Sequence, residues 1–582
     1  MGRGRRGGKM TKSDIVAILY EIAELLELTG ENPFKVRAYQ NAARTLEGRT
    51  ESIEDLVQSG KLGELPGIGE HIREKITTLI TEGHLKYYDD LKKKIPHGLL
   101  EMIRIPGLGP KKAKSLYEHL KVDSVEKLEK ACRDGKVAKV EGFGEKSAQK
   151  ILEGIEHAKK YSERHLYDEA WTAAQAIVAK LKKRKEIQKC EIAGSLRRCR
   201  ETIGDVDVLV SSKDPEAVME HFTKMPEVET VLSKGETKSS VNLKGTGIQV
   251  DIRVIAENAF PFALHYFTGS KEHNILMRQR AQAMAMKLNE YGLFKEEKGG
   301  RESPVACKSE EEIFKTLKLD YIPPEIREGM GEIEAAEKHK IPKLVEDGDI
   351  RGIFHVHSTW SDGTASLEEM IAEAQRQGLD YVGISDHSQT AAYAHGMEPK
   401  RVLQQEKEIQ KLRQQFKIRI FWGIESDILP DGSLDYREEI LGRFDFVIAS
   451  VHSSFTMSEK DMTNRIVKAL KNKYTTLLGH ATGRLLLSRE SYQVDMKKVI
   501  DAAGDYGKAI EINASPYRFD LDWRLGPYAK SKGVKVAINP DAHALNEIAN
   551  YHYGVGIARK AWMTKADVIT TYSTQQMEKF LS

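Results

Sequence analysis

The sequence predicts a multidomain protein with a helical N-terminal region, an α+β middle region and a C-terminal barrel of alternating strands and helices. At 582 residues the chain is too long for a single hydrophobic core. Apolar side chains recur at helical spacing from residue 11 to about 155, and three strand-like runs follow between residues 190 and 254. Beyond residue 350, seven short apolar runs alternate with helical stretches, which is typical of a parallel βα barrel.

The composition excludes several classes of protein. No run approaches the roughly 18–20 apolar residues that span a membrane, so we expect no membrane partner. Residues 1–9 are rich in Gly and Arg and lack the apolar segment of a secretory signal, so they are a basic arm or a tag remnant, with Met10 a possible native start. The four cysteines show no C-x-x-C spacing, which argues against a zinc ribbon or a disulfide framework and favours the cytoplasm. The net charge of +3 does not by itself indicate nucleic-acid binding.

A Gly-apolar-Gly turn occurs three times in the helical region, each time before a helix-forming stretch with Lys or Arg. Such a turn leaves backbone N–H groups free at a helix start, where they and the helix dipole attract an anion. With lysines nearby, we expect this anion to be a DNA phosphate. An ordinary helix–turn–helix corner is the alternative, but three copies favour nucleic-acid binding and resemble helix-hairpin-helix motifs. The expected DNA-binding residues are Gly67, Gly69, Lys75, Gly107, Gly109, Lys111, Lys112, Gly142, Gly144 and Lys146.

Three acids predict a metal centre in the middle region. Asp205 and Asp207 are two residues apart on one predicted strand, so both side chains face the same way, and Asp251 lies in the alternating run 248–254. Three carboxylates on one sheet face repel one another unless cations lie between them, and two Mg²⁺ ions fit this arrangement. One ion would activate a 3′-hydroxyl and the other would hold a triphosphate. An acidic strand edge with solvated carboxylates is the alternative.

The stretch from residue 194 to 207 resembles the palm motif of family X DNA polymerases, the family of DNA polymerase beta. Residues 266–270 resemble the nucleotide-binding turn of the thumb, and residues 321–324 resemble the end of the family's core, so the resemblance covers about residues 11–325. It implies a nucleotidyltransferase palm with Asp205, Asp207 and Asp251 as catalytic residues. Gapped or primer-template DNA and deoxynucleoside triphosphates are the implied partners, and we expect a monomer. The implied nucleotide-binding residues are Gly194, Ser195, Arg198, Gly204, Tyr266, Phe267, Gly269, Asn274 and Arg278.

The same resemblance assigns roles to the thumb residues. Tyr266 and Phe267 would lie against the sugar, Asn274 would reach the minor-groove edge of the incoming base, and Arg278 would contact the template strand. Lys271 departs from the pattern, since some relatives carry an acid there, which leaves nucleotide affinity and fidelity open.

A second departure concerns a possible lyase. Lys75 occupies the position where some relatives keep a nucleophile for 5′-deoxyribose phosphate, but His71 replaces a second lysine of that pocket. Because such chemistry needs a lysine of depressed pKa, a phosphate-binding lysine is the alternative.

Nine potential metal ligands follow predicted strands in the last third, where barrel enzymes place their chemistry. Such a set of nitrogen and oxygen ligands suffices for about three ions, and Mn²⁺ and Zn²⁺ are both compatible. The absence of cysteine argues against a structural zinc site. The set resembles that of the polymerase and histidinol phosphatase (PHP) domain over about residues 350–570. The expected ligands are His355, His357, Asp362, His387, Glu425, His452, His480, Asp541 and His543. Asp386 would support them, and Arg484 and Arg518 could contact phosphate.

These observations divide the chain into six segments. They are a helical DNA-binding domain (1–95), a second helix-hairpin-helix subdomain (96–155), the palm (156–258), the thumb (259–320), a linker (321–350) and a distorted (β/α)7 PHP barrel (351–582). The predicted function is gap-filling DNA synthesis with a PHP 3′–5′ exonuclease. The alternatives are a PHP abasic-site endonuclease or phosphatase, an idle PHP module on a DNA-binding scaffold, and a template-independent transferase.

Overall fold

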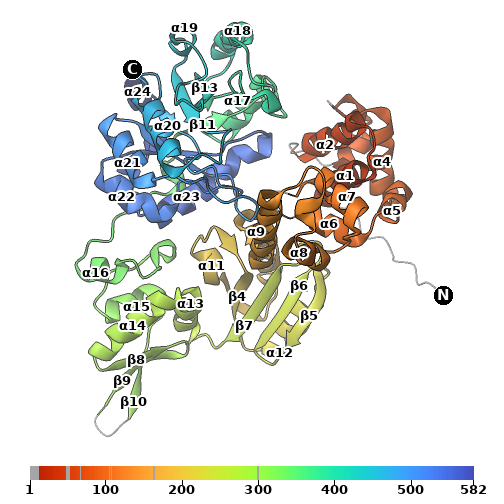
Figure 1. The fold of residues 1–582 in the computed structure, drawn as a ribbon. Coiled ribbons are helices and arrows are strands. Elements are labelled where there is room, and N and C mark those ends of the chain that lie inside the picture. The colour runs from red at the N-terminus through yellow and green to blue at the C-terminus, as the bar shows by residue number, and fades with distance from the viewer. Residues whose placement is uncertain are drawn as a thin grey trace, which may run out of the picture.

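The structure is a computed structural model that describes residues 12–47, 53–65, 67–103, 105, 108–161, 164–297 and 301–582. Two small helical bodies, an α+β region and a barrel follow one another along the chain, and the barrel lies beside the α+β region (Figure 1). None of the helices within these ranges is long and apolar enough to span a membrane. The predicted fold class is confirmed.

The helical region divides into two cores. The first is enclosed by α1 (Lys12–Thr29), α2 (Pro33–Glu47), α3 (Ile53–Gln58), α4 (Glu70–Glu82) and α5 (Lys86–Lys92). The second is enclosed by α6 (His97–Ile103), α7 (Pro110–Leu120), α8 (Val125–Arg133) and α9 (Glu145–Tyr161). The three Gly-apolar-Gly turns of the sequence directly precede α4, α7 and α9.

The palm is built on a five-stranded mixed sheet. Its strand order is β2 (Ile187–Ile192), β4 (Asp205–Ser212), β7 (Gln249–Ile255), β6 (Lys238–Leu243) and β5 (Val228–Lys234). Strands β4 and β7 run parallel and the other neighbours run antiparallel. The associated helices are α10 (Tyr167–Leu181), α11 (Gly194–Arg197) and α12 (Pro215–Thr223), and a short ribbon pairs β1 (His165–Leu166) with β3 (Thr202–Ile203). The sequence pattern does not predict β5, because nearly all its side chains are polar or exposed.

The thumb combines three helices with a small sheet. Helices α13 (Phe260–Thr268), α14 (Lys271–Ala283) and α15 (Glu310–Thr316) are present. Between α14 and α15, however, β8 (Met286–Asn289), β9 (Gly292–Glu296) and β10 (Glu302–Val305) form an antiparallel sheet. Each of these strands is too short to give a clear alternation. Residues 321–350 include α16 (Glu332–Glu337), and their apolar side chains join the thumb core.

Seven parallel strands form the barrel, as predicted. In order they are β11 (Gly352–Val356), β12 (Tyr381–Ile384), β13 (Arg419–Asp427), β14 (Phe446–Ser450), β15 (Leu477–Leu478), β16 (Ala509–Asn513) and β17 (Val536–Asn539). A bridge between Val356 and Ala542 nearly closes the barrel. The connecting and terminal helices are α17 (Leu367–Arg376), α18 (Pro399–Gln415), α19 (Glu438–Leu441), α20 (Glu459–Lys471), α21 (Met496–Asp505), α22 (Gly526–Ser531), α23 (Tyr551–Lys560) and α24 (Thr574–Leu581).

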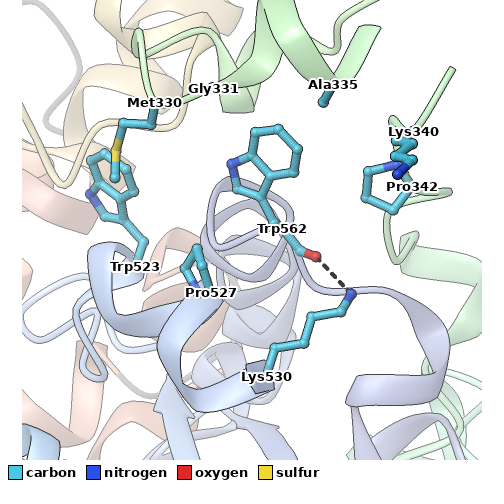
Figure 2. A pocket seen from close by; sticks show the side chains of 9 residues that line it. All are labelled: Met330, Gly331, Ala335, Lys340, Pro342, Trp523, Pro527, Lys530 and Trp562. Carbon is cyan, nitrogen blue, oxygen red and sulfur yellow. Dashed lines mark hydrogen bonds between the residues drawn. The ribbon is translucent and has the colours of Figure 1, made fainter. Parts of the chain in front are cut away.

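The palm and the barrel share one continuous apolar core. Tyr167 of α10 packs edge-on against Phe519 and Tyr553 of the barrel, with ring centroids 6.0 and 5.8 Å away. A cavity of about 510 Å³ separates residues 330–342 from the barrel, and Trp523 and Trp562 form part of its wall (Figure 2). The palm and the barrel are therefore joined by side-chain packing as well as by the chain between them.

Candidate active sites

The palm acids meet on neighbouring parallel strands. Asp207 lies opposite Asp251 in the β4–β7 register, and Asp205 begins β4. One oxygen from each of the three carboxylates lies within 4.8 Å of the other two. Asp251 is buried, Asp207 is half-buried and Asp205 is exposed, so the cluster reaches solvent through Asp205.

The electrostatics of this cluster favour a bound cation. Burial raises the pKa of Asp207 to about 7, and the charges of Asp205 and Asp251 contribute to the shift. Burial and Asp251 also raise the pKa of Asp205. Burial opposes ionisation of Asp251 as well, but hydrogen bonds from Lys238 and Gln249 outweigh it and lower its pKa. Clustered carboxylates fit Mg²⁺, which takes oxygen ligands and relieves like-charge repulsion.

Gly194 packs directly against the triad. Its φ of 65° is unfavourable for other residues, and a Cβ added there would lie 2.3 Å from Oδ2 of Asp207. The N–H of Ala193 donates to the carbonyl of Asp207, 2.9 Å away. Ser195 follows Gly194 in α11, and Gly204 directly precedes Asp205, the first residue of β4.

Arg198 lies between the palm, the thumb and the barrel. Its guanidinium donates to the carbonyl of Thr268, and Nε lies 3.1 Å from Oε1 of Glu328. Nζ of Lys560, at the end of α23, donates to the same Glu328 oxygen at 2.5 Å and to the Arg198 carbonyl at 3.0 Å. Neither Glu328 nor Lys560 is predictable from the sequence, because no local pattern connects two residues more than two hundred positions apart.

The predicted thumb contacts gather around the α13–α14 turn. The rings of Tyr266 and Phe267 meet edge to face, with centroids 5.2 Å apart. Gly269 ends α13 with φ 68°, and Nδ2 of Asn274 donates to the carbonyl of Tyr266 at 2.8 Å. Arg278 lies one turn further along α14, on its exposed side.

The glycine turns leave open space at helix starts. Gly69 and Gly109 precede α4 and α7, and neither helix has a side-chain cap on its first N–H groups. Added Cβ atoms would meet nothing within 4 Å at Gly69, Gly109, Gly142 and Gly144. The nearby side chains of Lys111, Lys112 and Lys146 are exposed, whereas Gly107 lies outside the described residues. A phosphate could therefore approach these backbone donors closely.

Lys75 has an aromatic environment. It lies in α4, which follows Gly67, and its Nζ is 4.9 Å from the ring centroid of Tyr87. Burial lowers the pKa of Lys75, and the charge of Lys35 adds to this against the opposing effect of Glu74.

All nine predicted barrel ligands gather at the carboxyl ends of the strands. His355 and Glu425 lie in β11 and β13, and the other seven follow strands. Their ligand atoms fall into four overlapping groups, within each of which every atom is within 4.8 Å of the others. The groups are His357–Asp362–His387–His543, His355–His357–Asp541, His355–Glu425–His480 and His387–Glu425–His452.

The donor atoms of this cluster fit transition metals. Nε2 of His355 and both ring nitrogens of His357 are buried and have no hydrogen-bond partner among the described residues. Burial lowers the pKa of His357 to about 3, helped by the charges of His543 and His387, so its imidazole is neutral. Neutral imidazole is the form that binds a metal, and an ion would satisfy these nitrogens.

A residue of β16 supports the cluster and is not among the predicted sites. Glu511 is fully buried, and its Oε2 lies 2.5 Å from Nδ1 of His355. Its Oε1 accepts from the N–H of His480 at 3.2 Å and from Nδ2 of Asn513 at 2.7 Å. The signal in the sequence is an acid and an amide within an otherwise apolar strand, which indicates buried polar partners.

The three supporting residues differ in their placement. Asp386 accepts hydrogen bonds from the N–H of Ser358 and from Gln405, so it fixes the loop after His357. Nε of Arg518 lies 3.2 Å from Oδ2 of Asp541. Arg484 instead donates to the Arg518 and Phe519 carbonyls, behind the cluster.

Family models match the chain in the order of these parts. The helix-hairpin-helix domain matches residues 10–85, and the SAM-like helix-hairpin-helix tandem matches residues 99–156. The DNA polymerase beta palm and thumb match residues 167–242 and 263–328. The PHP domain matches residues 354–515.

Three relatives cover different shares of the chain. The DNA polymerase/3′–5′ exonuclease PolX of Bacillus subtilis (strain 168) is 40% identical over 98% of this chain and 99% of its own length. Rat DNA polymerase lambda is 27% identical over 45% of this chain and 48% of its own length. A probable phosphatase of Thermoanaerobacter sp. (strain X514) is 30% identical over 37% of this chain and 89% of its own length. The chain thus belongs to the bacterial PolX family of DNA polymerases, with helix-hairpin-helix, palm, thumb and C-terminal PHP domains.

Proposed function

We propose that this chain is a DNA polymerase and 3′–5′ exonuclease that fills short gaps during DNA repair in the cytoplasm, with synthesis at the palm and hydrolysis at the barrel. The observation that carries this is the presence of two separate donor sets, a carboxylate triad on the palm sheet and nine ligands at the mouth of the barrel. The full-length match to a relative named for both activities supports the pairing.

At the palm, Asp205, Asp207 and Asp251 would hold Mg²⁺, which supplies activation of the 3′-hydroxyl and charge for the triphosphate. Ser195 and the backbone near Gly194 and Gly204 donate to the triphosphate. Arg198, whose guanidinium bonds to the Thr268 carbonyl and to Glu328, would add a cation for the same phosphates, and the Tyr266–Asn274 turn would orient the sugar and base. The helix-hairpin-helix turns hold the gapped or primer-template DNA through its phosphates.

At the barrel, the nine ligands would hold about three ions of Mn²⁺ or Zn²⁺, which supply an activated water and a clamp for the scissile phosphate. Glu511 fixes the ring of His355, and Arg518 offers a cation beside Asp541. A second candidate for this centre is a phosphatase, which the probable phosphatases similar to the barrel favour.

A one-nucleotide-gapped, labelled duplex tests both activities. With deoxynucleotides and Mg²⁺ we expect the gap to be filled, and with Mn²⁺ alone we expect stepwise shortening of the 3′ end. Filling without shortening would mean that the barrel acts on abasic-site or 3′-phosphate substrates instead, which would then be assayed directly. If the protein neither fills the gap nor shortens the strand, the proposal is contradicted.

Single substitutions separate the two centres. Asp207→Ala is expected to abolish filling while shortening continues, because Asp207 belongs to the palm triad and to none of the barrel groups. His357→Ala is expected to do the reverse, because His357 belongs to two of the barrel groups. Loss of both activities in either variant, with the fold intact by circular dichroism, would argue against independent centres.

A further inference from the structure

A second cavity at the junction of the palm and the barrel is lined by arginines. It has a volume of about 480 Å³, and five arginines against two glutamates line it. The arginines come from both domains: Arg164 and Arg200 from the palm side, and Arg484, Arg489 and Arg524 from the barrel. Such a concentration of one charge in a concave site attracts anions.

The arginine cavity adjoins the barrel centre. A neighbouring cavity of about 520 Å³ contains the proposed metal ligands Asp541 and His543. Residues 485–487 line both cavities, so a single loop separates the arginines from the metal ligands. On the palm side, Arg164 lines the first cavity and Leu166, two residues later, lines the second.

Not all of this charge is neutralised within the protein. Arg524 pairs with Glu201 and Asp522, and Arg484 pairs with Asp522. Arg489 forms no ion pair with any described residue. Its guanidinium donates to the carbonyl of Gly483.

The environment of Arg489 leaves a place for an external anion. Its guanidinium also lies over the ring of Phe455, 4.6 Å from the centroid. Burial lowers the pKa of Arg489, and the charge of Arg518 lowers it further. Burying a cation beside another cation is costly unless an anion accompanies it.

The chemistry of the neighbouring centre indicates which anion this is. A 3′–5′ exonuclease must hold a strand whose terminal phosphodiester reaches the metals, and the preceding phosphates then lie in adjoining space. Arginine matches phosphate oxygens with paired N–H donors, and grooves that hold single strands combine such charges with aromatic rings. We propose that the arginine cavity binds the phosphodiester backbone of the single-stranded 3′ segment whose end is hydrolysed at the barrel. This inference rests on the exonuclease activity proposed above.

The test compares Arg489→Gln with the unaltered full-length protein loaded with Mn²⁺. For a labelled single-stranded oligonucleotide, we expect KM to rise about three- to tenfold and the slope of log(kcat/KM) against log[salt] to fall by about one. Hydrolysis of bis(p-nitrophenyl) phosphate, which has no flanking phosphates, is expected to keep its rate. Arg164→Gln tests the palm side in the same way and should give the same pattern. Arg376→Gln, which removes an arginine paired with Glu373 on the outer helix α17, is the matched control.

The outcomes separate this inference from the proposed function. If the unaltered protein does not shorten DNA, the exonuclease proposal fails. If it does, but Arg489→Gln and Arg164→Gln both keep the KM and the salt slope, the strand site is wrong. Equal losses on DNA and on bis(p-nitrophenyl) phosphate would also overturn it, because Arg489 would then act through the metal centre. Arg489→Lys, which keeps the charge, should restore most of the salt slope. If Arg489→Gln lowers the melting temperature, the comparison rests on Arg164→Gln.

Discussion

Asp207 shows the cost of assembling a metal site from clustered carboxylates. Its pKa in the folded protein, about 7, lies above the ordinary value of 3.8, so folding favours its protonated form. The carboxyl of Asp207 therefore favours the folded state most below pH 4. This contribution to the free energy of unfolding is lost as the pH rises through 7. Without a metal, ionised Asp207 therefore destabilises the palm at pH 8.

Asp207→Asn should remove this destabilisation. In EDTA at pH 8 we expect the free energy of unfolding to rise by about 1–3 kcal/mol, seen by calorimetry as a higher melting temperature of the palm transition. The gain should be smaller at pH 5 and vanish below pH 4, where the carboxyl is protonated in both the folded and the unfolded chain. Glu229→Gln, on exposed β5, serves as the control. A gain of equal size at both pH values would contradict the electrostatic cause.

Lys75 allows a chemical prediction at the same scale. Since its lowered pKa leaves more free amine at neutral pH, we expect it to form a Schiff base with an incised abasic site, trapped as a covalent adduct by borohydride. Lys75→Arg keeps the charge and should abolish the adduct, whereas Lys86→Arg in α5 should retain it. The side chain of His71, where relatives keep a second lysine, is 92% exposed, so it cannot share the pocket. An adduct that survives Lys75→Arg would assign the amine elsewhere.

At the scale of single elements, β16 is as important to the barrel centre as the strands that carry ligands. Glu511 contacts His355 and His480 from beneath, and second-layer carboxylates fix ligand orientation. We expect Glu511→Gln to lower the metal content by mass spectrometry and to reduce exonuclease activity by about 10–100-fold, while gap filling continues. Glu373→Gln on α17 is the control. Full metal content with full activity would show that Glu511 has no positioning role.

The elements also show what the sequence could and could not predict. The seven barrel strands are predictable because each is a buried apolar run, and the ligands stand out as polar residues where those runs end. Strand β6 reads as a polar segment, so Lys238, which lies 2.7 Å from Asp251, has no local signal. Glu511 is hidden within a strand that otherwise reads as core. Glu328 and Lys560 meet only through tertiary packing, which no local periodicity encodes.

At the scale of the whole molecule, Lys560 connects the barrel to the proposed nucleotide site. Its side chain is fully buried and holds Glu328, which pairs with Arg198. We expect Lys560→Met to raise the KM for deoxynucleotides about five- to tenfold, with a smaller effect on kcat, because Glu328, once it has lost Lys560, would pair more strongly with Arg198 and hold it away from the triphosphate.

The matched variant for this prediction is Lys530→Met, which removes a lysine from the cavity in Figure 2 without touching Glu328. Exonuclease activity and the melting temperature report whether the barrel is intact. A fall in kcat at unchanged KM, or equal effects of both lysine substitutions, would count against the connection through Arg198.

The shared core of palm and barrel has a consequence for how the two activities are balanced in a cell. Because both centres lie on one chain and share an apolar core, the trimming activity cannot be recruited or released, and its stoichiometry to the polymerase stays at one to one. A strand end leaving one centre also meets the other at an effective concentration on the order of millimolar. The balance between the two activities is therefore set by the nucleotide concentration. Abundant nucleotides favour extension of the strand end, and scarce nucleotides favour its shortening.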